Sequence, residues 1–185
     1  GISSLSTVSA EEISKFKTPK IFHLYFHKDK ELTKDMIQKC KELNFDALAL
    51  TVDTITGGNR ERDLKSGFTS PPKFTAKNII SYATSPMWTL NYLLRKKFDL
   101  PFLSQYVEEG TSFNISVSDY FSTMLDQNMN WKDAEYIRKF WNGPFCLKGI
   151  MSVDDAKQAV KIGASAIMIS NHGGRQLDGS RSPFD

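Results

Sequence analysis

The segment 170–179 carries the densest group of chemically active side chains in the sequence. His172 lies three residues before Arg175, and two adjacent glycines separate them. An imidazole titrates near neutrality and suits a general base, whereas a guanidinium binds a carboxylate through two parallel hydrogen bonds. Adjacent glycines let the backbone approach a ligand closely. The spacing indicates a loop that binds a small acid and removes a proton from it; a capped surface turn is the alternative.

A second polar group follows the apolar run 47–52. Asp53 comes first, then the glycine pair 57–58 and Arg60. Asp53 would orient His172 and balance its charge. The segment lacks the GK[ST] ending of a P-loop and the GxGxxG of a dinucleotide fold, which disfavours ATP and nicotinamide sites. The three histidines show no ligand spacing such as HExxH, so we predict no metal site.

Polar side chains recur where predicted strands end. They are Tyr25 on the first strand, Thr51 and Asp53 on the second, Lys148 on the third, and Ser170 and His172 on the fourth. Any one of them alone reads as a cap or a solvated charge. Because parallel α/β folds place their sites at the carboxyl ends of the strands, four such placements predict one shared site.

The elements that position these residues alternate along the chain. Aromatic and branched residues predict strands at 20–26, 47–52, 144–148 and 165–170. Capping residues and apolar spacing predict helices at about 10–16, from 30 to 43, at 131–141 and at 152–162. Such alternation predicts an α/β fold with right-handed crossovers, either an open doubly wound sheet or a (β/α)8 TIM barrel.

The length of the chain bears on this choice. Its 185 residues suit one domain, whereas a complete barrel needs about 250. We therefore expect 1–185 to be a single partial barrel domain, a central fragment whose two ends look cut. It would hold roughly strands 2–6 of a barrel.

A long insertion at 64–130 follows strand 4 of the expected barrel. Loops of this length are usually functional. Its stretch 87–98 joins an apolar helical pattern to a basic cluster. We expect a helix packed on the outside of the barrel; contact with an anionic membrane surface is the alternative.

The composition restricts the function classes. Hydrophobic residues make up 40% and charged residues 24%, as in ordinary globular proteins. A net charge of +3 gives no support for nucleic-acid binding. Cys40 and Cys146 lie far apart, which favours a reducing compartment. The chain shows neither an apolar run long enough to span a bilayer nor the pattern of a signal peptide, so we expect a cytoplasmic protein.

The heptapeptide SNHGGRQ at 170–176 resembles the active-site signature of the FMN-dependent α-hydroxy-acid dehydrogenases and oxidases. Supporting matches are LY at 24–25, TVDT at 51–54, Gly58 with RERD at 60–63, and LKGI at 147–150. Together they cover nearly the whole chain. WKD at 131–133 and FWNGP at 140–144 are most similar to the membrane-associated bacterial L-lactate dehydrogenases of that family.

The resemblance implies roles for the matching residues. His172 would be the base that takes a proton from the 2-hydroxy acid, and Asp53 would stabilise the imidazolium. Arg175 would bind the substrate carboxylate with support from Arg60, and Tyr25 would hydrogen-bond the substrate hydroxyl. The cofactor FMN would be contacted by Ser6, His23, Thr51, Lys148 and Ser170. The charge of Lys148 would stabilise the reduced flavin.

The chain departs from the family pattern at two points. His23 stands where the family usually has a flavin-contacting Gln, which would alter the flavin potential. The family residues that hold the FMN phosphate belong to strands seven and eight, which would follow Asp185. We therefore expect the 185-residue chain to hold FMN weakly.

The resemblance implies oxidation of an L-2-hydroxy acid, L-lactate to pyruvate, with electrons passed to a quinone or cytochrome. A homotetramer at the cytoplasmic face of the inner membrane would fit the family. A hydroxy-acid oxidase that uses oxygen, a non-catalytic truncated remnant and a phosphate-binding barrel isomerase remain alternatives.

Overall fold

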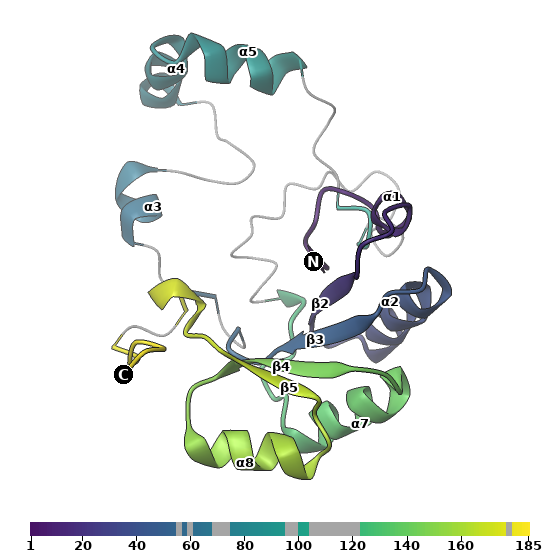
Figure 1. Ribbon diagram of the computed structural model, residues 1–185. Coiled ribbons are helices and arrows are strands. Elements are labelled where there is room, and N and C mark those ends of the chain that lie inside the picture. The colour runs from purple at the N-terminus through teal and green to yellow at the C-terminus, as the bar shows by residue number, and fades with distance from the viewer. Residues whose placement is uncertain (55–56, 59–60, 68–74, 95–99, 104–122, 177–178) are drawn as a thin grey trace.

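The computed structural model describes residues 1–54, 57–58, 61–67, 75–94, 100–103, 123–176 and 179–185 (Figure 1). The strands are β1 (Ile2–Ser3), β2 (Ile21–Tyr25), β3 (Ala47–Thr51), β4 (Phe145–Ile150) and β5 (Ala166–Ile169). The helices are α1 (Ala10–Ser14), α2 (Lys30–Glu42), α3 (Glu61–Ser66), α4 (Ala76–Ala83), α5 (Pro86–Leu94), α7 (Trp131–Trp141) and α8 (Val153–Lys161), followed by the 3₁₀-helix η2 (His172–Gly174).

The strands form one parallel sheet in the order β1-β2-β3-β4-β5. A doubly wound sheet would reverse its strand order at a switch point, whereas each strand here lies beside its predecessor. The α/β prediction is confirmed, and the consecutive order is that of a (β/α)8 barrel wall. The four predicted strands are all present, and the two-residue strand β1 is too short for the sequence pattern to have marked it.

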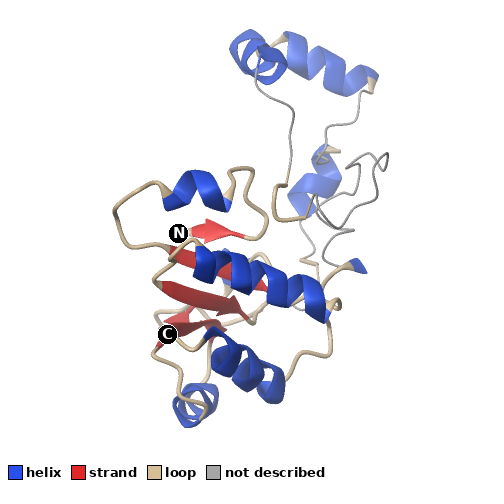
Figure 2. Ribbon diagram, turned by 90° about the vertical axis from the view of Figure 1, so that its right-hand side faces the viewer, coloured by secondary structure: helices blue, strands red, loops and turns tan. Residues whose placement is uncertain are grey.

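The two faces of the sheet have different surroundings. Phe22, Leu24, Leu48 and Leu147 are fully buried under the helices. Figure 2 shows α2 and α7 lying side by side along this face, and their apolar residues join the same core. The alternate positions of β2 and β4 are only partly buried. Because successive side chains point to opposite faces, the polar positions share the face opposite α2 and α7, which corresponds to the interior of a barrel.

Local signals at the helix ends explain why these helices begin and end where they do. Asp29 accepts hydrogen bonds from the backbone N–H groups of Glu31 and Leu32 at the start of α2. Asn130 and Asp133 form a capping box at the start of α7, and Asn142 ends that helix at a φ of 55°. Such caps supply partners for backbone groups that the helix leaves free.

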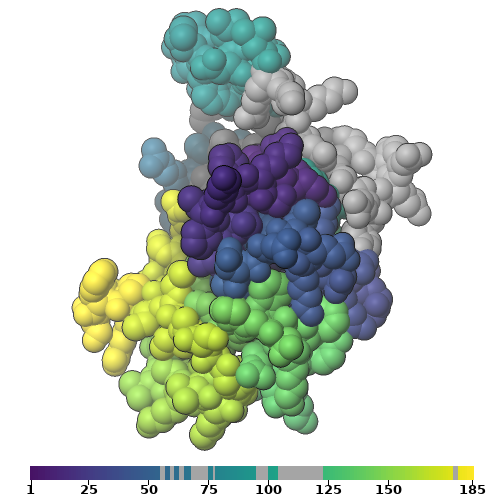
Figure 3. Space-filling model, turned by 45° about the vertical axis from the view of Figure 1, so that its right-hand side comes forward, coloured from purple at the N-terminus to yellow at the C-terminus, as the bar shows by residue number. Residues whose placement is uncertain are grey.

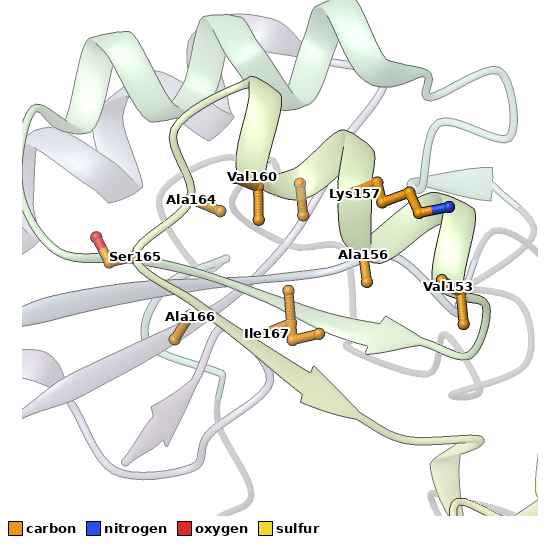
Figure 4. A pocket seen from close by; sticks show the side chains of 9 residues that line it. Val153, Ala156, Lys157, Val160, Ala164, Ser165, Ala166 and Ile167 are labelled. Atoms are coloured by element: carbon orange, nitrogen blue, oxygen red, sulfur yellow. The ribbon is translucent and has the colours of Figure 1, made fainter.

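Helix α8 and strand β5, at the edge of the sheet opposite β1, are much more exposed than α2, α7 and the central strands. Val153 and Val160 of α8 are 71% and 73% exposed, and all four residues of β5 are exposed. A largely apolar groove of about 410 Å³ runs between α8 and the edge of β5 (Figure 4). In a closed barrel this is where the next strand and helix would pack.

The helix pair α4–α5 projects from the rest of the structure (Figure 3). Leu93 and Leu94 are 71% and 76% exposed, and no residue of α5 is buried. The expectation of a helix packed on the barrel exterior is therefore wrong for the described part of 87–98. Its basic cluster at 95–97 lies outside the described residues. Within the described chain, no helix has the length and apolar character needed to cross a membrane.

Candidate functional site

Three of the predicted site residues lie in one row across the sheet. Tyr25 pairs with Thr51, and Thr51 pairs with Lys148, in the parallel register of β2, β3 and β4. Residues in register on neighbouring strands point to the same face. The row therefore places a phenol, a hydroxyl and an ammonium group side by side at the carboxyl ends of the strands, on the face opposite α2 and α7.

Asp53, Lys148 and His172 form a cluster just beyond this row. The His172 Nδ1 atom lies 3.1 Å from Asp53 Oδ1 and 3.4 Å from Lys148 Nζ. Lys148 Nζ lies 3.9 Å from Asp53 Oδ2. The side chains are only 11%, 17% and 21% exposed for Asp53, Lys148 and His172. Residues that are 119 positions apart in the sequence thus meet in a partly desolvated site.

The geometry selects a role for each imidazole nitrogen. A carboxylate only accepts hydrogen bonds and an ammonium only donates them, so in the tautomer that bonds Asp53 at 3.1 Å the Nδ1 atom of His172 carries the hydrogen and does not accept one from Lys148. The Nε2 atom is then left with a lone pair. A nitrogen with a free lone pair, held by a carboxylate on the other side of the ring, is suited to accept a proton from a substrate.

An unusual backbone conformation presents His172. Its φ is 59°, and Gly173 and Gly174 follow at 67° and 68°. The Ser170 Oγ atom accepts a hydrogen bond from the His172 N–H at 3.1 Å. Asn171 Oδ1 accepts one from the Gly174 N–H at 3.2 Å. Non-glycine residues in the left-handed region are uncommon and cluster at functional sites.

Two predicted cofactor residues lie close to the amino-terminal strand. His23 is on the same face as Tyr25, two residues earlier along β2, and pairs with Ser3 of β1. Its partial burial lowers its pKa, and the positive charge of Lys148 adds to this shift. Ser6 lies in the turn after β1, where its Oγ atom accepts a hydrogen bond from the Val8 N–H at 3.1 Å.

The structure describes only one of the two arginines predicted to bind substrate. Arg175 follows η2 directly and is exposed, so its guanidinium is on the same loop as His172. Arg60 lies outside the described residues. The structure thus brings five predicted residues together, namely Tyr25, Thr51, Asp53, Lys148 and His172.

Gly149 is a residue of this site that the sequence reasoning did not single out. It has a φ of 111° and lies at a register shift between β4 and β5. A methyl group built on it would lie 2.6 Å from Asp53 Cβ. An isolated glycine inside a strand signals a bulge or a close backbone approach, but the strand predicted at 144–148 ended before this position, so the signal was not recognised.

A further histidine has very different surroundings. His27 follows β2, is fully buried and forms an isolated antiparallel bridge with Leu125. Burial lowers its pKa to about 4; the charge of Asp29 opposes this shift and that of Lys30 adds to it. His27 is therefore neutral near pH 7.

The residues of the cluster fit a flavin. The buried Asp53 Oδ2 atom makes no hydrogen bond to any described residue, and Lys148 offers a partly desolvated cation on the floor of the site. Thr51 and Ser170 add hydroxyl groups at the ends of β3 and β5, the strands on either side of β4. Within the described chain, no group of His, Cys, Asp and Glu side chains could hold a metal ion. This donor set suits a polar heterocycle that gains negative charge on reduction.

Comparisons with known proteins agree with this chemistry. The family model of the FMN-dependent dehydrogenases matches residues 1–185. An L-lactate dehydrogenase of Pseudomonas syringae pv. syringae (strain B728a) is 39% identical over 180 residues, which cover 96% of this chain and 47% of that protein. One of Vibrio parahaemolyticus serotype O3:K6 (strain RIMD 2210633) is 38% identical over 180 residues, with the same coverage of 96% and 47%.

The fold of the chain also matches solved structures. The structure of (S)-mandelate dehydrogenase, described as a monotopic membrane protein, matches with a TM-score of 0.86 at 30% identity, covering 99% of this chain and 48% of that one. A mandelate oxidase matches with a TM-score of 0.71 at 28% identity, covering 99% and 43%. The chain therefore spans about half the length of the relatives it matches.

Proposed function

The chain belongs to the FMN-dependent dehydrogenase family, and from this premise we propose that it forms part of a flavoenzyme that oxidises L-lactate to pyruvate. The contact between His172 and Asp53 carries this proposal, because it holds a proton acceptor beside a cation on the floor of the site. The names of the bacterial relatives support lactate as the 2-hydroxy acid.

His172 acts as the base in this proposal. Its Nε2 atom takes the proton from the substrate, and the positive charge that results lies 3.1 Å from the Asp53 carboxylate on the other side of the ring. The left-handed backbone conformation at His172 (φ 59°) supports this role. Bound FMN supplies the acceptor for the two electrons that leave the substrate.

Arg175 and Tyr25 orient the substrate. The guanidinium of Arg175 pairs with the substrate carboxylate through two hydrogen bonds, with Arg60 in support. The phenol of Tyr25 hydrogen-bonds the hydroxyl that becomes a keto group. An acid held at both ends presents its reacting carbon in one orientation, which removes much of the entropic barrier.

The remaining residues hold the cofactor. Lys148 is placed to compensate negative charge on the flavin ring. Thr51 and Ser170 offer hydroxyl groups at the ends of β3 and β5, while His23 and Ser6 would contact the cofactor from β2 and the turn after β1.

Anaerobic reduction tests this function. Full-length protein reconstituted with FMN should lose its flavin absorbance near 450 nm when L-lactate is added without oxygen, and D-lactate serves as the control. Failure of every L-2-hydroxy acid to bleach the flavin contradicts the proposal. An oxygen-consumption assay on the same protein separates an oxidase from a dehydrogenase that passes electrons to a quinone or cytochrome.

We further propose that α4 and α5 contact the cytoplasmic surface of a membrane, where a quinone is available as electron acceptor. The pair has no acidic residue. Its exposed apolar side chains are Ile79, Ile80, Met87, Trp88, Leu90, Leu93 and Leu94. The rings of Tyr82, Trp88 and Tyr92 stack with centroids 5.2 and 5.3 Å apart, and such aromatic groups favour the membrane interface. The relative described as a monotopic membrane protein supports this contact.

Co-sedimentation with anionic lipid vesicles tests the contact. We expect full-length protein to bind, and Leu93→Glu with Leu94→Glu to reduce binding strongly, because each change puts a charge where an apolar side chain would enter the lipid. Phe16→Glu is the matched control, since Phe16 is also exposed (62%) but lies next to α1. Equal binding of all three proteins contradicts the proposal.

A further inference from the structure

Gly149 leaves the space that Asp53 occupies. A methyl group on Gly149 would lie 2.6 Å from Cβ, 2.7 Å from Cγ and 3.0 Å from the backbone N of Asp53. The first two contacts are shorter than side chains tolerate, and the second involves the carboxyl carbon itself. The φ of 111° is a further obstacle to any other residue at this position. The position of the carboxylate therefore depends on the missing side chain of its neighbour on β4.

Gly58 makes a similarly close approach to the loop that carries Arg175. A methyl group on Gly58 would lie 1.8 Å from the backbone O of Arg175 and 2.5 Å from Gln176 Oε1. The backbone of Gly58 is not in the left-handed region, so the close contact is the main obstacle to a larger residue. The loop after β3 thus lies directly against the loop that carries the guanidinium.

We infer that Gly149 and Gly58 are positioning residues for two separable halves of the site. Gly149 sets the place of Asp53 and, through it, of the His172 ring. Gly58 sets the place of Arg175. This inference rests on the proposed function for the roles of His172 and Arg175, but the contacts of the two glycines are properties of the chain alone.

The two halves should respond differently to a single methyl group. A displaced Asp53 no longer orients the base, which lowers the rate of the chemical step. A displaced Arg175 weakens the hold on the substrate carboxylate, which lowers affinity for both substrate and product. A shift of about 1 Å in such groups can cost on the order of 100-fold in rate, so both effects are measurable.

The experiment compares Gly149→Ala, Gly58→Ala and Gly67→Ala in the full-length FMN-loaded protein. Gly67→Ala is the matched control, because Gly67 has a φ of 70° and a methyl group there would have no atom of the described residues within 4 Å. We expect Gly149→Ala to lower the kcat for flavin reduction at least about tenfold with little change in KM. We expect Gly58→Ala to raise KM and the Kd for pyruvate about tenfold with little change in kcat. Gly67→Ala should change neither parameter.

Further measurements separate positioning from folding. A crystal structure of the Gly149→Ala protein should show Asp53 withdrawn from His172 while β4 is retained. Equal effects of both substitutions on kcat and KM overturn the inference. So does a Gly149→Ala or Gly58→Ala protein that fails to fold while Gly67→Ala folds, since that result assigns the glycine to the fold. If L-2-hydroxy acids do not reduce even the unmodified protein, the proposed function fails; the crystal structure then still decides whether Gly149 places Asp53.

Discussion

His172 and His27 each follow the carboxyl end of a strand, yet their surroundings are opposite. His172 is partly exposed, has the Asp53 carboxylate 3.1 Å from Nδ1 and belongs to a left-handed loop. His27 is fully buried, and its backbone N–H donates to Thr33 Oγ1 at 3.3 Å. The backbones of residues 26–28 and 124–126 pair on both sides of it.

The difference shows that residue type and distance from a strand end do not define a catalytic base. A base needs a route to substrate and a partner that stabilises its charged form. His172 is partly exposed and lies beside the Asp53 carboxylate, whereas the burial that lowers the pKa of His27 keeps it neutral and removed from solvent. His27 therefore belongs to the packing between β2 and the returning end of the insertion.

The largest expected effect is that of His172→Gln. Gln retains a polar side chain but cannot take a proton, so flavin reduction by L-lactate should fall about 10²- to 10⁴-fold while FMN stays bound. Stopped-flow absorbance under anaerobic conditions measures the rate. His27→Gln is the matched control and should reduce the flavin at nearly the rate of the unmodified protein. Unchanged reduction in His172→Gln would remove the assigned base.

The second effect concerns stability and its dependence on pH. The unfolded chain protonates His27 near its ordinary pKa of 6.5, but the folded chain does so only at about 4. The unfolded state thus binds more protons between these values, and stability falls as the pH decreases from about 6.5 to about 4. The loss amounts to about 3 kcal/mol.

Urea unfolding at pH 7 and at pH 4 measures this loss. The decrease in the free energy of unfolding should be smaller by about that amount in His27→Gln than in the unmodified protein, because carboxylate titration is common to both. An identical pH dependence of the two proteins would show that His27 is accessible to protons in the folded state.

The smallest of the three effects is that of Arg175→Lys, which tests the loop around His172. An ammonium group keeps the charge but cannot reproduce the planar pair of hydrogen bonds. We expect KM for L-lactate to rise about tenfold with a smaller change in kcat. Steady-state kinetics with a saturating electron acceptor measure both parameters, and an unaltered KM would count against the carboxylate clamp.

Most of the fold was predictable from local sequence signals. The helix predicted at 131–141 has those bounds in the structure, because a capping box begins it and an asparagine ends it. The predicted strand at 144–148 runs instead from Phe145 to Ile150. Glycine is unfavourable in strands, so the pattern gave no reason to extend that strand through Gly149. Whether a given strand residue points to the helices or to the opposite face depends on contacts with other elements, which the periodicity of one segment does not describe.

The sequence predicted which candidate residues would lie near one another, but not the geometry that joins them. Strand-end placement correctly predicted that Tyr25, Thr51 and Lys148 share one edge of the sheet, since register follows from parallel pairing. The left-handed turn at His172 and the close approach of Gly149 to Asp53 arise from contacts between loops distant in sequence. The roles of all the predicted site residues stay predictions, and Arg60 lies outside the described residues.

The exposed edge of β5 has a consequence for the solubility of this polypeptide. An edge strand with unpaired backbone groups and neighbouring apolar side chains can pair with strands of other molecules. A recombinant protein ending at Asp185 should therefore aggregate at high concentration. The same edge makes the chain a candidate for split-enzyme reconstitution. A separately produced polypeptide that supplies the next strand and helix should rescue solubility on mixing, and a charged substitution at Ile167 should prevent this rescue.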